Sequence, residues 1–173
     1  MRETEWRGDF PCPDLSSGVV TQPHTDQIFR PESFRRLVDG VTVRLREIYA
    51  MTPFDCLVGI GFSGVPLVSV LSHQLGVPMA LVRKPEVSRA CDAAHVTGYI
   101  DCRRYLIVDD LVASGWTVQW VVTSLAGVSD AEPVGVLTYN QADHRRPLKI
   151  ELGTRTVLVP VLGMTQELPA CPS

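Results

Sequence analysis

The sequence predicts a single α/β domain built on a parallel β-sheet. Three observations support this: the chain length, the alternation of strand-like and helix-like stretches, and the unbroken apolar character of the strands. The 173 residues are the size of one ordinary domain. The strand-like stretches are nearly continuous hydrophobic runs, as in parallel sheets whose two faces are both covered by helices.

The elements can be predicted one after another along the chain. Apolar residues at helical spacing predict an amphipathic helix over about 32–50, between Pro31 and Pro53. Strand and helix signals then alternate, which is typical of βαβ units. The expected strands cover 56–61, 79–83, 105–109, 134–139 and 156–162, and the expected helices cover 65–76 and 117–127.

The two ends of the chain are expected to lie outside the α/β core. Residues 1–30 contain several prolines and little periodicity, which predicts an irregular arm. Residues 31–162 make up the predicted core and 163–173 a C-terminal tail. Within the core, the polar segment 85–101 shows weak periodicity. A loop of that length in a compact domain is typical of a lid or a binding loop.

Composition argues against several classes of protein. The net charge of −3 provides no basic surface for nucleic acid. No apolar run is long enough for a membrane helix, and the polar N-terminus is unlike a signal peptide. Five cysteines without a CxxC pair, and four histidines without paired spacing, argue against a disulfide scaffold and a zinc site. We therefore expect a cytoplasmic protein.

The first candidate site is the segment 59–64, which reads GIGFSG. It satisfies GxGxxG between a predicted strand and a predicted helix, the context of dinucleotide binding. That motif also requires an acid about twenty residues further on, for the ribose hydroxyls. Arg83 and Lys84 stand there instead, and they would at best suit a phosphorylated ribose. An NAD(P)-binding Rossmann protein is therefore an alternative that we do not favour.

The second candidate site is the segment 105–117, which reads YLIVDDLVASGWT. A buried strand delivers Asp109 and Asp110 to its carboxyl end, and the small residues of 113–117 precede a helix. Backbone N–H groups at such a helix start bind anions. Adjacent carboxylates bind sugar hydroxyls or a hydrated divalent cation. A turn aspartate and a capping serine would explain each feature singly, but their combination indicates a sugar phosphate.

The segment YLIVDDLVASGWT resembles the phosphoribosyl-pyrophosphate signature of the type I phosphoribosyltransferases. Upstream, GFSG (61–64) resembles the pyrophosphate loop of that family, and VRKP (82–85) resembles its basic strand end. The resemblance covers about residues 55–140. It implies a single-domain type I phosphoribosyltransferase fold with a small hood, built from the N-terminal arm and the C-terminal segment. VRKP together with DDLVASG is closest to the adenine enzymes, while orotate enzymes and unassigned members remain open.

The resemblance implies a reaction and a role for each matched residue. A 5-phosphoribosyl group would pass from phosphoribosyl pyrophosphate to a nitrogenous base, an adenine-like purine being favoured, with release of pyrophosphate. The implied enzyme is a Mg²⁺-dependent homodimer of nucleotide salvage. Asp109 and Asp110 would bind the ribose hydroxyls and hold the metal through water. The 5′-phosphate would lie on Ala113, Ser114, Gly115, Trp116 and Thr117, and pyrophosphate on Gly61, Phe62, Ser63, Gly64, Arg83 and Lys84.

Three positions depart from the family pattern. The lid offers Arg89 and His95 where relatives commonly have a lysine, so either Arg89 is the catalytic cation or that function is missing. Ala113 replaces an aspartate that handles the proton of the base in 6-oxopurine enzymes, which disfavours hypoxanthine and guanine. Trp116 replaces a small residue, and we expect it to pack on the core rather than border the site. The lysine-poor lid also keeps a second hypothesis open, a non-catalytic sensor that binds phosphoribosyl pyrophosphate.

Overall fold

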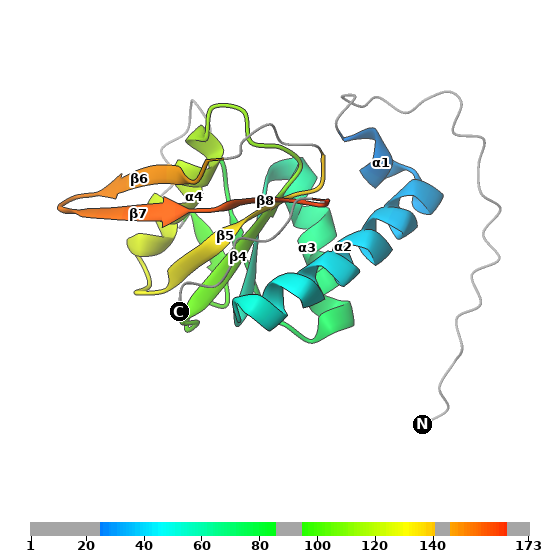
Figure 1. Cartoon of the computed structure of the whole chain (residues 1–173), viewed down its shortest axis with the longest axis horizontal. Coiled ribbons are helices and arrows are strands. Elements are labelled where there is room, and N and C mark those ends of the chain that lie inside the picture. The colour runs from blue at the N-terminus through cyan, green and yellow to red at the C-terminus, as the bar shows by residue number, and fades with distance from the viewer. Residues whose placement is uncertain (1–24, 86–94, 141–145, 166–173) are drawn as a thin grey trace.

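The computed structural model describes residues 25–85, 95–140 and 146–165. It confirms an α/β fold in which helices pack on a mainly parallel sheet (Figure 1). The helices are α1 (Asp26–Phe29), α2 (Pro31–Met51), α3 (Gly61–Leu75) and α4 (Trp116–Ala126). The strands are β1 (Cys56–Ile60), β2 (Met79–Val82), β3 (Val96–Gly98), β4 (Arg104–Asp109), β5 (Glu132–Thr138), β6 (Leu148–Leu152), β7 (Arg155–Val159) and β8 (Val161–Gly163).

Six strands form the main sheet in the order β3-β2-β1-β4-β5-β8. Only β3 runs antiparallel to its neighbour in this sheet. The chain passes from β1 through α3 to β2 on one side, and from β4 through α4 to β5 on the other. The winding therefore reverses between β1 and β4, and ligands of such sheets bind beyond the strand ends at this reversal. Both candidate sites follow these two strands, so the topology brings them together.

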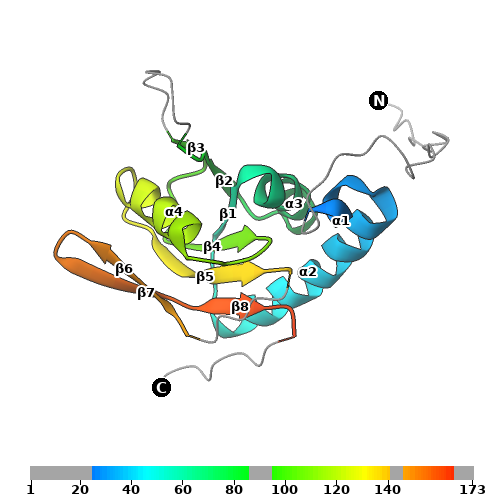
Figure 2. The ribbon, with the colours of Figure 1, turned by 90° about the horizontal axis from the view of Figure 1, so that it is seen from above.

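Helices and a hairpin bury both faces of the sheet (Figure 2). Alternate residues of a strand point to opposite faces. In β4, Leu106 and Val108 pack on the side of α2 and α3, whereas Tyr105 and Ile107 pack on the side of α4 and the β6–β7 hairpin. Burial on both faces explains why the central strands are apolar at nearly every position.

The structure corrects the predicted elements at several points. Helix α3 begins at Gly61, so GFSG forms its first turn rather than a loop before a helix at 65. The predicted strand 156–162 is two strands on either side of Pro160, which has no N–H for a ladder. The arm is not irregular throughout, because it contains α1. The 85–101 segment is not wholly a loop, because it contains β3; its residues 86–94 lie outside the described ranges.

None of the helices in the described ranges combines the length and apolar character needed to cross a membrane. Residues 1–24 and 166–173, which make up most of the predicted hood and tail, are outside the described part of the chain. The division into arm, core and tail therefore stays a prediction.

Candidate active site

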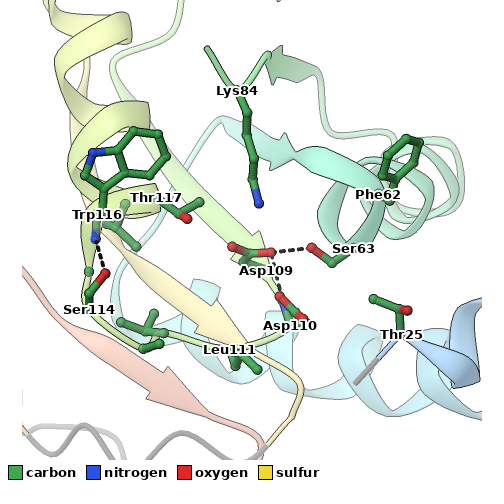
Figure 3. A pocket seen from close by; sticks show the side chains of 14 residues that line it. Thr25, Phe62, Ser63, Lys84, Asp109, Asp110, Leu111, Ser114, Trp116 and Thr117 are labelled. Carbon is green, nitrogen blue, oxygen red and sulfur yellow. Dashed lines mark hydrogen bonds between the residues drawn. The ribbon is translucent and has the colours of Figure 1, made fainter. Parts of the chain in front are cut away.

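A pocket of about 360 Å³ lies at the reversal of the sheet, beyond the ends of β1 and β4. Figure 3 shows Phe62 and Trp116 on opposite sides of it, with the side chain of Lys84 pointing between them toward Asp109. Most of the predicted sugar-phosphate residues line this pocket, together with residues that the sequence did not single out. The lining is formed by Thr25, Phe62, Ser63, Lys84 and all residues from Asp109 to Val118.

Two buried carboxylates form the floor of the pocket. Asp109 is only 3% exposed and Asp110 only 7%. The Ser63 hydroxyl donates a hydrogen bond of 2.6 Å to Oδ1 of Asp109, and the backbone N–H of Asp110 donates one of 3.0 Å to the same oxygen. The end of β4 thus places two largely buried acids at the pocket.

Burial controls the protonation of Asp109. Loss of hydration raises the pKa of its carboxyl to about 7, the nearby carboxylate of Asp110 raises it as well, and the Ser63 hydrogen bond opposes the rise. Perturbed carboxylates inside a cleft are typical of functional sites. Ligand hydroxyls or a cation at Asp109 would stabilise its ionised form.

The start of α4 forms one wall of the pocket. Gly115 precedes the helix with a φ of 79°, a conformation that favours glycine. The carbonyl of Gly115 accepts a hydrogen bond from the backbone N–H of Gln119, so helical hydrogen bonding begins in the first turn. The early N–H groups of a helix lack partners within the helix and carry the positive end of its dipole. The loop 113–117 therefore presents donors to an anion in the pocket.

The start of α3 forms the facing wall, and Lys84 adds a full positive charge to it. Phe62 and Ser63, in the first turn of α3, line the pocket. The Lys84 side chain lies against Gly61: a methyl group built on Gly61 would come within 3.5 Å of Nζ. Gly61 has a φ of 65°. A second helix start, with a lysine beside it, therefore faces the first across the two carboxylates.

Trp116 corrects the expectation that this residue packs on the core. It is 50% exposed and lines the pocket. As the first helical residue its side chain points away from the sheet and stacks on Trp120, with ring centroids 6.2 Å apart. Trp120 in turn donates a hydrogen bond of 2.8 Å to the Arg83 carbonyl and contacts the ring of His95.

The remaining predicted residues do not line the pocket or lie outside the described part of the chain. Arg83 does not line the pocket, and its backbone is held between His95 and Trp120. Gly61 and Gly64 lie beneath the lining rather than in it. Arg89 lies outside the described residues. In the described part of the chain, no group of three or more His, Cys, Asp or Glu is arranged to hold a metal ion.

Comparison with known proteins decides the family. The model of the phosphoribosyl transferase domain matches residues 24–147, most of the chain and all of the pocket lining. The chain belongs to this family. The predicted resemblance is therefore confirmed, and the NAD(P)-binding alternative is not supported.

Individual relatives of this chain differ in the base for which they are named. The adenine phosphoribosyltransferase of Chlorobium phaeovibrioides is 31% identical over 141 residues, which cover 73% of each protein. The orotate phosphoribosyltransferase of Pyrobaculum islandicum is 29% identical over 119 residues, 64% of this chain and 57% of the relative. The chain thus spans just over half the length of that relative. The adenine phosphoribosyltransferase structure from Saccharomyces cerevisiae shares the fold, with a TM-score of 0.57 and 21% identity over 88% of this chain and 91% of that one.

Close packing explains the glycines of GIGFSG in this chain, without a dinucleotide. A Cβ on Gly64 would lie 2.5 Å from the Val108 carbonyl oxygen, and one on Gly59 would lie 3.2 Å from the backbone of Gly64. Helix α3 can therefore lie against β1 and β4 only because these positions have no side chain. The same spacing in the dinucleotide motif also serves close helix–strand packing.

Sequence reasoning missed three residues that shape the site. Thr25 lines the pocket from just before α1, where the sequence has no signal. Tyr139 donates a hydrogen bond of 3.1 Å to the carbonyl of Ser63, and its place at the end of a predicted strand was the available signal. Trp120 supports Trp116 and the end of β2, and its spacing of four residues from Trp116 on a predicted helix was a usable clue.

Proposed function

We propose that this protein transfers a 5-phosphoribosyl group from phosphoribosyl pyrophosphate to a nitrogenous base and releases pyrophosphate. One observation supports this above the others: two helix starts and Lys84 flank a pair of buried carboxylates within a single pocket. A ligand with an anionic group at each end and hydroxyls between them complements that arrangement. Phosphoribosyl pyrophosphate has this order of groups.

The charges of the pocket match the charges that the reaction would create. Breaking the bond at C1 of the ribose builds positive charge on the sugar and negative charge on the departing pyrophosphate. Asp109 and Asp110 would bind the ribose hydroxyls beside the first charge. The first turn of α3 and Lys84 would face the second, while the loop 113–117 would hold the 5′-phosphate. Preorganised charges in a water-poor site are an effective means of catalysis.

The two carboxylates also fit a magnesium ion. Mg²⁺ commonly uses one or two carboxylates, several waters and the phosphates of a substrate. Asp109 and Asp110 would hold the hydrated ion, which would neutralise the phosphates of the donor. The homodimer and the salvage role form part of the same proposal and rest on the family resemblance. The cytoplasmic location is also proposed, and it rests on the composition of the chain.

Among acceptors, we favour an adenine-like purine. VRKP and DDLVASG are closest to the adenine enzymes, and Ala113 lacks the carboxylate that would handle the proton of a 6-oxopurine. Relatives named for adenine and for orotate are nearly equal in identity to this chain. Overall similarity therefore does not choose between them, and the proposal depends on these few positions.

The decisive experiment is incubation with phosphoribosyl pyrophosphate, Mg²⁺ and a panel of bases, with pyrophosphate release as the readout. We expect turnover with adenine above that with orotate, hypoxanthine and guanine. If only another base is turned over, the proposed acceptor is wrong and the proposed reaction stands. Tight donor binding without turnover on any base would contradict the enzyme and support the sensor.

Removing both acids tests the donor site itself. We expect the double variant Asp109→Asn/Asp110→Asn to bind phosphoribosyl pyrophosphate at least about 100-fold more weakly, because it loses hydrogen bonds to charged groups at two positions. Isothermal titration calorimetry measures this. The matched control, Asp101→Asn/Asp130→Asn, removes the same charge from exposed positions and should bind as the wild type does. Equal affinities of the two double variants would refute the site.

A further inference from the structure

If Ser63 bound pyrophosphate through its backbone alone, the position of its side chain would have no explanation. Its hydroxyl is buried, points at Asp109 and donates the 2.6 Å hydrogen bond to Oδ1 (Figure 3). The two residues are 46 positions apart in the sequence and belong to different elements, α3 and β4. This contact joins the two halves of the site directly.

The hydrogen bond leaves Asp109 with one oxygen for a ligand. The hydrogen bonds from the Ser63 hydroxyl and from the Asp110 N–H both end on Oδ1 of Asp109, and the Asp110 carboxyl lies beside the same carboxylate. A carboxylate held by two donors on one oxygen has little freedom to rotate. Since Asp109 also lines the pocket, Oδ2 is the atom available to a hydroxyl or a hydrated cation.

Ser63 itself is held in place from two sides. Its carbonyl accepts a hydrogen bond from the buried Tyr139 hydroxyl. The adjacent Gly64 packs so closely against the Val108 carbonyl that no side chain would fit there. The Ser63 hydroxyl is therefore held in a fixed position. Its hydrogen bond couples the position of α3 to that of the Asp109 carboxylate.

We propose that Ser63 is a positioning residue, whose hydroxyl fixes the Asp109 carboxylate so that Oδ2 meets the donor sugar. This inference rests on the proposed function for the identity of the ligand. It adds a second role for the first turn of α3. The backbone of this turn would face pyrophosphate, and the Ser63 side chain would act on the ribose through Asp109. A residue that positions a group within a few tenths of an ångström contributes to affinity without touching the substrate.

The test compares Ser63→Ala with the wild type in the presence of Mg²⁺. We expect the Kd and the KM for phosphoribosyl pyrophosphate to rise about tenfold, the size expected for one lost hydrogen bond to a charged group. The KM for the base should stay within about twofold, because the acceptor does not contact Asp109 Oδ2. An unchanged or lowered donor Kd would overturn the proposal; a lowered one would show that the bond opposes binding.

Two further variants separate positioning from packing. Ser63→Cys fills the same space with a weak donor, so it should resemble Ser63→Ala; wild-type affinity in this variant would show that only volume matters. Ser69→Ala removes another α3 hydroxyl, which donates to the Val65 carbonyl away from the pocket. It should leave the donor Kd unchanged, and an equal rise there would assign the effect to the helix as a whole.

A structural readout without ligand distinguishes failure of this inference from failure of the proposed function. Crystal structures should show one Asp109 side-chain conformer in the wild type. In Ser63→Ala they should show a rotated conformer or two alternative conformers. The same single conformer in both would overturn the positioning role even if the donor binds. If the rotation occurs but neither protein binds phosphoribosyl pyrophosphate, the role of Ser63 in holding Asp109 stands and the assigned ligand is wrong.

Discussion

At the scale of single residues, the place of Asp109 in the pocket lowers the stability of the fold. Its carboxyl is almost fully buried, and its pKa is raised to about 7, chiefly by burial. The folded protein therefore holds this proton more tightly than the unfolded chain, in which an aspartate titrates near pH 4. A raised carboxyl pKa means that the folded state loses stability as the pH rises from about 4 to about 7.

Asp109→Asn should remove that cost while keeping an acceptor for Ser63 and the Asp110 N–H. We expect the variant to exceed the wild type in free energy of unfolding at pH 8, and by much less at pH 5, because the ionised carboxylate is destabilised only in the wild type. Urea denaturation at both pH values measures this. Exposed Asp101→Asn is the control and should show no such pH dependence. A variant that is less stable than the wild type at pH 8 would mean that the ionised carboxylate is well satisfied.

At the scale of elements, the site depends on how closely α3 approaches the sheet. The helix begins at Gly61, directly after β1, and its first turn reaches across to β4. The sequence predicted this helix to begin four residues later, and the two glycines of its first turn have poor helix propensity. Close packing against the strand backbone outweighs that local preference.

Gly64→Ala tests this close approach. The added methyl would meet the Val108 carbonyl oxygen at 2.5 Å, so the helix must shift. We expect a loss of about 1–3 kcal/mol in the free energy of unfolding, measured in urea, as for other overpacked sites. Gly127→Ala is the matched control: its φ of −77° is ordinary, and its added methyl meets nothing nearer than 3.5 Å. If the two variants lose the same stability, close approach is not the reason for glycine at 64.

At the scale of the whole molecule, the first long helix and the last strand brace one another. Arg44 on α2 is only 7% exposed and donates a hydrogen bond of 3.0 Å to the Gly163 carbonyl at the end of β8. Its guanidinium also pairs with Glu47 at 2.8 Å. The edge strand β8 is thereby attached to the helical layer as well as to β5.

Arg44→Ala should release that attachment. We expect the free energy of unfolding to fall by about 2 kcal/mol, because a partly buried carbonyl loses its charged donor. Chemical denaturation checks the value. Arg46→Ala, an exposed arginine on the same helix, should change stability by less than about 0.5 kcal/mol. Similar losses in the two variants would show that α2 is sensitive to any loss of an arginine.

The parts of the site that are contiguous in sequence could be predicted. Asp109, Asp110 and the loop 113–117 lie within thirteen successive residues, so covalent geometry alone keeps them together once β4 and α4 form. The family resemblance added the GFSG segment to the same site, and the carboxyl ends of parallel strands do meet at one edge of the sheet. These features depend on local pattern, and the structure confirms that they share a pocket.

Only the tertiary structure decided how the distant segments meet. Strand order and register bring the Ser63 hydroxyl to Asp109 and the Trp120 indole to the Arg83 carbonyl. They also leave Trp116 at the pocket wall. They pair β3 with β2 and β6 with β7, and of these strands β3 and β6 are too short or too polar to be predicted from periodicity. The sequence alone therefore determined the chemical groups of the donor site. Their mutual orientation came from long-range packing, because hydrogen bonds between segments far apart in the chain exist only once the sheet is assembled.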